Sequence, residues 1–272
     1  MSNRPSKPRF WLVPVLALLL IAAGRIDAAP LDGDTVFKKM KAALEPAKPS
    51  TRTLTLTVHS AEFGENTQVV LRQARKFSPE GERSVTVVMS PDALKGVTFL
   101  VVEQQGKPHA QYLYLPALRR VRTISGPSSF EPFLNSDFAY ADLGLLEIHE
   151  KSLKLLATTN RGGARAYELE EKPRQTWYYS RIVDWIAVET GLPLERDHYD
   201  DADVLWRKQA YEDVASIDGV PTPMRVRVDD VQSDDWSEYK VDDLHYDVQI
   251  PDEIFDPKRL PGVVASPVWS SK

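Results

Sequence analysis

The sequence predicts a mainly β protein built on one large antiparallel sheet. Short runs of alternating or β-branched residues recur about every ten residues, giving about a dozen strands. Turn-forming residues separate these runs, and a single segment has clear helical spacing. No linker rich in Pro, Gly or Ser divides the strands, so one continuous sheet is expected.

The first segment has the features of an export signal. A basic stretch precedes an apolar run over residues 10–23, and Ala28 offers a small residue for cleavage. The run is shorter than the ~20 apolar residues that span a bilayer. We therefore expect residues 1–28 to be a cleavable signal peptide and residues 29–272 to form a single domain, released in soluble form. An uncleaved membrane anchor is the alternative.

Composition excludes several classes of function. The chain has no cysteine, which excludes disulfides, thiolate zinc sites, cysteine nucleophiles and lipidation at a cysteine. Without residues 1–28 it keeps 30 basic and 38 acidic residues, a net charge of −8. That charge argues against nucleic acid as a partner and against tight docking on an anionic bilayer.

The first predicted element of the mature chain is an amphipathic helix. Asp34 is a suitable N-cap and Pro46 ends the run. The apolar residues between them recur at helical spacing: Val36, Phe37, Met40 and Leu44. Such a helix buries its apolar side, so we expect it to cover the core of the β domain.

Strand patterns then continue to Ser125. The predicted strands span residues 51–60, 67–77, 82–89, 96–103, 111–115 and 121–125. The first alternates cleanly, with Leu54, Leu56 and Val58 on one face and threonines on the other. Turn residues between neighbouring runs indicate a meander of antiparallel hairpins.

Strands resume after residue 150. Their predicted ranges are 152–158, 164–170, 177–189, 194–199, 204–214, 222–230 and 236–246. Two runs, 96–103 and 182–188, are apolar on both faces, whereas a strand open to solvent on one side shows a polar face. Either protein covers both faces or a ligand occupies one. A sheet of this size encloses more area than one or two helices fill, which favours a cavity.

The segment between the two sets of strands is rich in aromatic residues. Phe130, Phe133, Phe138 and Tyr140 fall within eleven residues. A polar connection between strands rarely has this composition, so we expect a lid over an apolar surface or one wall of a cavity. Packing as ordinary core is the alternative.

A basic cluster precedes this segment: Arg119, Arg120 and Arg122. The planar guanidinium group suits phosphate or carboxylate oxygens, so these residues are candidates for contact with a lipid headgroup or a partner protein. The alternative is that they are exposed charges on the shoulder of a hairpin.

The amino-acid sequence of this region resembles that of a known family. YLPALRRVRTIS over residues 114–125, followed by F-x-x-F-x-x-S-D-F-x-Y-x-D-L over residues 130–143, is similar to the outer-membrane lipoprotein-sorting family in its LolA-like branch. Leu-Pro-Leu at 192–194, Asp-Gly-Val-Pro-Thr-Pro at 218–223 and the segment 246–260 extend the resemblance over most of the mature chain.

The resemblance implies both a fold and a function. The fold would be an unclosed antiparallel β-barrel of LolA/LolB type, with a few covering helices around an apolar cavity. The protein would be a non-catalytic periplasmic carrier that takes lipoprotein acyl chains or lipids toward the outer membrane. It would receive them from an inner-membrane exporter of resistance-nodulation type and pass them to an outer-membrane acceptor. The alternative is an accessory subunit that docks on an exporter or envelope complex and carries nothing.

The residues expected to form the cavity or its lid are apolar or aromatic: Leu54, Leu56, Val58, Val85, Val87, Phe99, Val101, Tyr114, Phe130, Phe133, Phe138 and Tyr140. No motif indicates catalysis, a cofactor or a metal, since the five histidines stand alone and no nucleophile elbow or phosphate loop occurs. The acidic run 197–203 offers oxygen ligands for calcium, but a charged hairpin tip is the simpler interpretation. A hydrolase would require two carboxylates converging in a pocket with raised pKa values.

Overall fold

The computed structural model describes residues 31–78, 81–103, 109–143 and 150–270. The expected signal peptide, residues 1–28, lies outside the described residues. Within the described part, no helix is both long and apolar enough to cross a membrane.

One antiparallel sheet of 13 strands dominates the chain from residue 31 onward. The strands are β1 (Ser50–Ser60), β2 (Glu65–Ser78), β3 (Gly81–Ser90), β4 (Thr98–Val102), β5 (Ala110–Leu115), β6 (Arg120–Ile124), β7 (Lys151–Arg161), β8 (Ala164–Pro173), β9 (Arg181–Ala187), β10 (Pro193–Tyr199), β11 (Leu205–Ile217), β12 (Val220–Asp230) and β13 (Trp236–Tyr246). Their order in the sheet is β6-β5-β4-β3-β2-β1-β13-β12-β11-β10-β9-β8-β7. The first strand therefore pairs with the last, and the sheet does not close between β6 and β7, as expected for an unclosed barrel.

Each predicted strand coincides with an observed one, with small differences at the ends. The clearest difference is the predicted strand 177–189, whose ordered pairing begins only at Arg181. Trp177, Tyr178 and Tyr179 instead form an aromatic cluster with Phe130, in which neighbouring ring centroids lie 4.7–5.9 Å apart. Aromatic side chains at the start of the run therefore serve tertiary packing rather than strand pairing.

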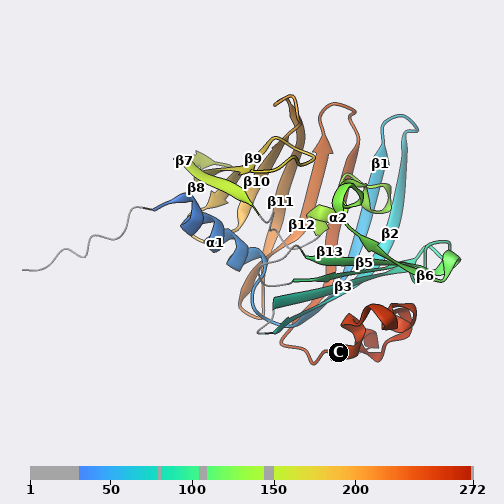
Figure 1. Cartoon of the computed structure of the whole chain (residues 1–272). Helices are drawn as coiled ribbons and strands as arrows, with labels where there is room; N and C mark the ends of the chain where they lie inside the picture. Colours follow the sequence, from blue (N-terminus) through green and yellow to red (C-terminus); the bar gives the residue numbers. More distant parts are fainter. Residues whose placement is uncertain (1–30, 79–80, 104–108, 144–149, 271–272) are drawn as a thin grey trace, which may run out of the picture. The chain divides into compact units, whose positions relative to one another are not determined.

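The two faces of the sheet are covered by different segments. We call the face that carries Leu54, Leu56 and Leu71 the inner face, since Leu54 pairs directly with Leu71 and paired residues share a face. The opposite, outer face carries Val85 and its partner Leu100. Figure 1 shows helix α1 beside β7 and β8, and the C-terminal segment next to β3.

Helix α1 (Gly33–Leu44) covers one end of the inner face. Its cap is Asp32 rather than the predicted Asp34, because the Asp32 carboxylate accepts a hydrogen bond from the Thr35 N–H at 2.8 Å. The buried side of the helix packs with strand residues in one cluster: Val36, Phe37, Met40, Leu169 and Ile186. The amphipathic helix expected from the sequence is present, and it covers β7, β8 and β9.

Residues 126–143, the lid segment, cover another part of the inner face. This segment contains the 3₁₀ turns η2 (Gly126–Phe130) and η3 (Phe133–Asn135) and the short helix α2 (Tyr140–Leu143). Phe133 and Tyr140 pack on Phe99 of β4, with ring centroids 5.9 and 5.3 Å apart. The Phe138 ring lies 5.5 Å from that of Tyr239 on β13.

The C-terminal segment, residues 250–270, covers the outer face with η4 (Asp252–Phe255), η5 (Pro257–Ala265) and η6 (Pro267–Ser270). It buries apolar residues from both sides in one cluster: Ala74, Val85, Val87, Leu100, Tyr114, Ile250, Ile254, Phe255, Leu260, Val263 and Val268. The 96–103 run is apolar on both faces, and the C-terminal segment covers its outer face. In this part of the sheet, the inner face is the one that remains available for a cavity.

Candidate ligand-binding cavity

A cavity of about 170 Å³ opens on the inner face, between the end of α1, the lid segment and strands of both sheet halves. Its apolar lining residues are Ala43, Leu44, Leu54, Leu56, Leu71, Phe133, Phe138, Leu143, Pro221, Pro223 and Val226. Its polar lining residues are Glu45, Arg52, Gln73, Arg75, Glu82, Ser84, Thr86, Asp142, Arg196, Gln209, Tyr211, Thr222, Tyr239 and Tyr246. The cavity is thus amphipathic, where the sequence predicted an apolar one.

The polar and apolar linings follow the register of the strands. Leu54 on β1 pairs with Leu71 on β2, which forms an apolar row across the sheet. Arg52 pairs with Gln73, and Gln73 with Thr86 on β3, which forms a polar row two residues away. Two residues along a strand span about 7 Å, so the two rows are neighbours.

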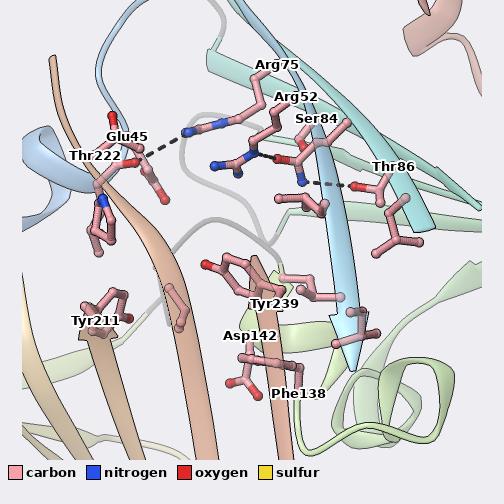
Figure 2. A pocket seen from close by; sticks show the side chains of 18 of the residues that line it. Glu45, Arg52, Arg75, Ser84, Thr86, Phe138, Asp142, Tyr211, Thr222 and Tyr239 are labelled. Atoms are coloured by element: carbon pink, nitrogen blue, oxygen red, sulfur yellow. Dashed lines mark hydrogen bonds between the residues drawn. The ribbon is translucent and has the colours of Figure 1, made fainter. Parts of the chain in front are cut away.

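Figure 2 shows where the labelled lining residues lie around the cavity. Arg52 and Arg75 lie on one side of the cavity, and Phe138 and Asp142 of the lid segment lie on the other. Tyr239 stands between them. An elongated ligand with a polar end and an apolar end matches this arrangement.

Hydrogen bonds hold the polar row in place. The Nε–H of Arg52 donates to Oε1 of Gln73 at 2.7 Å, and Nε2 of Gln73 donates to Oγ1 of Thr86 at 3.0 Å. The pKa of the Arg52 guanidinium is lowered, mainly by burial and then by the nearby positive charge of Arg75. Arginine remains protonated in proteins, so Arg52 presents a positive charge to the cavity.

Arg75 is already neutralised. Its Nε–H donates to Oε1 of Glu82 at 2.5 Å, and Nη1 donates to the carbonyl of Leu44 at 3.4 Å. Both members of the ion pair are buried, with 9% and 3% of the two side chains exposed. The pair ties β2 and β3 to the end of α1.

A second buried ionic group lies behind the cavity wall, under α1. Arg196 pairs with Asp184 at 2.6 Å and with Glu171 at 3.5 Å, and Lys151 pairs with Glu171 at 2.8 Å. Burial raises the pKa of Asp184 well above its usual range. Burial would also raise that of Glu171, but Lys151 and Arg196 outweigh it and lower the Glu171 pKa.

These carboxylates are the pair that a hydrolase interpretation would require, since they converge and one has a raised pKa. Their position does not favour catalysis, however. Of the four residues, only Arg196 lines the cavity, and Asp184 is fully buried. Both carboxylates are also paired with cations, which is typical of a structural network.

Two carboxylates anchor the lid segment. The Tyr178 hydroxyl donates to Oδ1 of Asp142, whose Oδ2 accepts from the Ala139 N–H at 2.7 Å. Asp137 Oδ2 accepts a hydrogen bond from the Ser237 hydroxyl at 2.6 Å, and the backbone N–H of Asp137 donates to Oγ of Ser237 at 2.9 Å. Burial raises the pKa of both Asp137 and Asp142.

Some of the predicted cavity residues are brought together here. Leu54, Leu56, Phe133 and Phe138 line the cavity. Others lie in the apolar cluster beside it without lining it: Val58, Phe99, Val101 and Tyr140. Phe130 belongs to the aromatic cluster with Trp177 and Tyr178.

Three predicted cavity residues lie on the wrong face. Val85, Val87 and Tyr114 are on the outer face, where the C-terminal segment covers them. On β3 the polar residues Ser84 and Thr86 are the ones that face the cavity. The apolar residues of β3 pack under the C-terminal segment instead, which leaves the polar residues of the strand on the cavity side.

The basic cluster does not reach the cavity. Arg119 follows the 3₁₀ turn η1 (Pro116–Leu118) with φ 48°, and Arg120 and Arg122 lie on the edge strand β6. All three are exposed and make no ion pair with any described residue. Charged residues on an edge strand also prevent unwanted strand pairing, so their part in partner contact stays a prediction.

The acidic run at 197–203 comprises the end of β10 and most of the β10–β11 connection. Oδ1 of Asp200 accepts from the N–H groups of Ala202 and Val204 at 3.0 and 2.9 Å, and Asp203 pairs with Arg181 at 2.6 Å. These bonds shape the turn. Among residues 31–270, apart from the three gaps, no group of three or more His, Asp or Glu could hold a metal ion.

Sequence reasoning missed the polar end of the cavity. Arg52 lies two residues before Leu54 on the same strand face, and Arg75 lies four residues after Leu71 on its strand. A charged residue in line with core residues was the available signal, since it places a charge on a buried face.

Comparisons with known proteins identify a family and a shared fold. A family model described as an uncharacterized protein family matches residues 80–261, about two thirds of the chain. The chain belongs to this family. No curated protein sequence matches the chain significantly.

Several solved structures share the fold. A domain described as a candidate outer membrane lipoprotein-sorting protein, from Vibrio parahaemolyticus, matches with a TM-score of 0.78 at 24% identity, covering 84% of this chain and 98% of that one. A DUF1329 family protein from Desulfovibrio piger matches with a TM-score of 0.76 at 26% identity and the same coverage. A LolA superfamily protein from Nitrosomonas europaea matches with a TM-score of 0.67 at 16% identity, covering 83% and 98%. The predicted resemblance in fold to LolA-like lipoprotein-sorting proteins is confirmed, and so is the mainly β, unclosed sheet.

Proposed function

We propose that this LolA-like protein is a non-catalytic periplasmic carrier that shields an acyl chain from water on its way toward the outer membrane. The observation that carries the proposal is the cavity on the inner face, with leucines of β1 and β2 below and Phe133 and Phe138 of the lid segment above. The cleavable signal peptide, the single mature domain and release into the periplasm are parts of the same proposal.

The physical task is the transfer of an apolar chain through water. Each CH₂ group buried is worth about 0.8 kcal/mol, so a chain of about fourteen carbons faces a barrier on the order of 11 kcal/mol. A bilayer solvates the chain about as well as a pocket does. Affinity alone therefore does not extract the ligand, and a donor complex or a change in the lid must bias the exchange.

The size of the cavity makes the lid segment central to this function. Its volume of about 170 Å³ is smaller than the ~300–1,000 Å³ of ordinary ligand pockets. A full acyl chain therefore requires the lid segment to move. The polar anchors of the segment are few, mainly Asp137 with Ser237 and Asp142 with Tyr178.

The donor would be an inner-membrane exporter of resistance-nodulation type, and the acceptor an outer-membrane component. The exposed basic cluster at Arg119, Arg120 and Arg122 is the candidate contact surface. The same cluster, together with the small cavity, supports the second candidate function, an accessory subunit that docks on such a complex without carrying a ligand.

The two functions differ in one measurable property, the uptake of an acyl chain. The exported protein would be titrated against a fluorescent fatty acid, followed by displacement with an unlabelled one. A carrier takes up the probe with saturable, displaceable binding. An absence of binding at any concentration below probe micellisation would refute the carrier and favour the docking subunit.

A further inference from the structure

The guanidinium group of Arg52 has more hydrogen-bonding capacity than the protein uses. Arginine has five N–H donors, and among the described residues only the Nε–H of Arg52 has a partner, the Gln73 side chain at 2.7 Å. No ion pair joins Arg52 to a carboxylate in the described part of the chain. Its terminal nitrogens belong to a side chain that lines the cavity (Figure 2).

The neighbouring charges do not supply the missing partner. Glu82 is engaged with Arg75 at 2.5 Å, and Asp184 with Arg196 at 2.6 Å. Glu45 lines the same end of the cavity, but its charge acts on Arg75 and it forms no ion pair with Arg52. Glu45 and Glu82 balance the two arginine charges at this end of the cavity, but neither forms an ion pair with Arg52 in the part of the chain that the structure describes.

Hydrogen-bond donors without partners are costly in a partly buried site, and departures from this rule are expected mainly at functional sites. Asp142, on the opposite side of the cavity, already accepts from Tyr178 and from the Ala139 N–H. It is a lid anchor on the other side of the cavity (Figure 2), and it forms no ion pair with Arg52 among the described residues. An anionic group on a ligand would supply acceptors for the remaining N–H groups of Arg52.

We propose that the cavity selects acyl ligands with one negatively charged oxygen group at the end of the chain, a carboxylate or a phosphate, held by Arg52. The alkyl chain then runs over the neighbouring apolar row at Leu54 and Leu56, beneath Phe138. The row spacing of about 7 Å places the chain directly next to the charged end. A guanidinium group binds either anion through two parallel hydrogen bonds. This inference rests on the carrier function and names its ligand class.

The test compares ligands that share a chain and differ only in the terminal group. Lauric acid, dodecyl phosphate and 1-dodecanol would each displace a fluorescent acyl probe from the exported protein at neutral pH. We expect both anions to bind about tenfold or more tightly than the alcohol, as hydrogen bonds to charged groups imply. Acetate and inorganic phosphate, which have the anion without the chain, should not displace the probe at the same concentrations.

Three variants locate the effect. Arg52→Gln should bind the acids as weakly as the alcohol and leave the affinity for the alcohol unchanged, whereas Arg52→Lys keeps the charge and should retain part of the preference. Arg165→Gln removes an exposed charge of β8 and should behave as the unmodified protein. Circular dichroism would verify that each variant is folded.

The outcomes separate this inference from the proposed function. If no ligand binds, the carrier function itself is wrong. If the alcohol binds as well as the acids, or Arg52→Gln keeps the preference for acids, the headgroup inference is overturned and the carrier stands. Displacement by acetate or phosphate alone would also overturn it, because the site would then hold small free anions.

Discussion

Replacing Phe138 with alanine tests the assignment of the lid segment to the ligand. The Phe138 ring is buried, lines the cavity and packs on Tyr239 at 5.5 Å. Removing a buried phenylalanine side chain costs about 3–5 kcal/mol of folding free energy. Because one side of this ring already borders a cavity, we expect Phe138→Ala to lie near the lower end of that range.

The effect on binding follows from the contact that the ligand loses. If the ring covers two CH₂ groups of an acyl chain, its loss removes about 1.6 kcal/mol, or roughly tenfold in affinity. Displacement of a fluorescent fatty acid measures the affinity, and urea unfolding measures the stability. The matched control is Phe255→Ala, since Phe255 is equally buried but packs on the outer face.

The two variants should therefore differ in their affinity for the acyl chain and agree in their loss of stability. Both should lose stability, and only Phe138→Ala should bind the acyl chain more weakly. Equal loss of affinity in the two variants would show that binding responds to general destabilisation. Unchanged affinity in Phe138→Ala would remove the lid segment from the binding site.

Two further predictions concern buried ionisable groups. Glu82→Gln leaves Arg75 without its charge partner and should lower the free energy of unfolding in urea by about 3–5 kcal/mol. The control Asp203→Asn breaks an exposed pair with Arg181 and should cost less than about 1 kcal/mol. Similar values for the two variants would refute the assignment of Arg75–Glu82 as a buried pair. The pKa of His198 is lowered well below 6.5, mainly by burial and then by Arg196 and Arg207, so the unfolded chain binds a proton that the folded protein excludes. The free energy of unfolding should therefore fall as the pH drops below 6.5, by up to about 1.4 kcal/mol per pH unit. His198→Phe should flatten this dependence. A variant with the same pH profile as the unmodified protein would contradict the burial of a neutral imidazole.

Strands, turns and the first helix could be predicted because their signals are local. The alternation of Leu54, Leu56 and Val58 with threonines sets the face of β1 without reference to any other element. The spacing of Val36, Phe37 and Met40 does the same for α1. Only the cap moved, from Asp34 to Asp32, because two acidic residues two positions apart compete for that role.

Which face of β3 lines the cavity could not be predicted in this way. The strand alternates Glu82, Ser84 and Thr86 with Val85 and Val87, and local pattern assigns the polar set to solvent. The assignment is reversed by a distant segment, since residues 250–270 cover the valines and leave the polar set facing the cavity. No local pattern in β3 shows that a segment about 170 residues later will cover it.

The polar end of the cavity was missed for a related reason. Arg52 and Gln73 become neighbours only through the β1–β2 register, and Arg196 reaches the same cavity from the other half of the sheet. The β1–β13 pairing joins these halves. Residues far apart in sequence therefore build one wall, and their relation is a property of topology rather than of spacing.

Native mass spectrometry would show directly whether the protein carries an acyl ligand. The exported protein would be purified from the periplasm without detergent, weighed intact and then extracted with organic solvent. The carrier account predicts a mass increment at a defined stoichiometry and an extract that contains an anionic acyl compound. The carrier function would be contradicted by a protein that is detected without a mass increment, yields no lipid on extraction and does not take up added fatty acid.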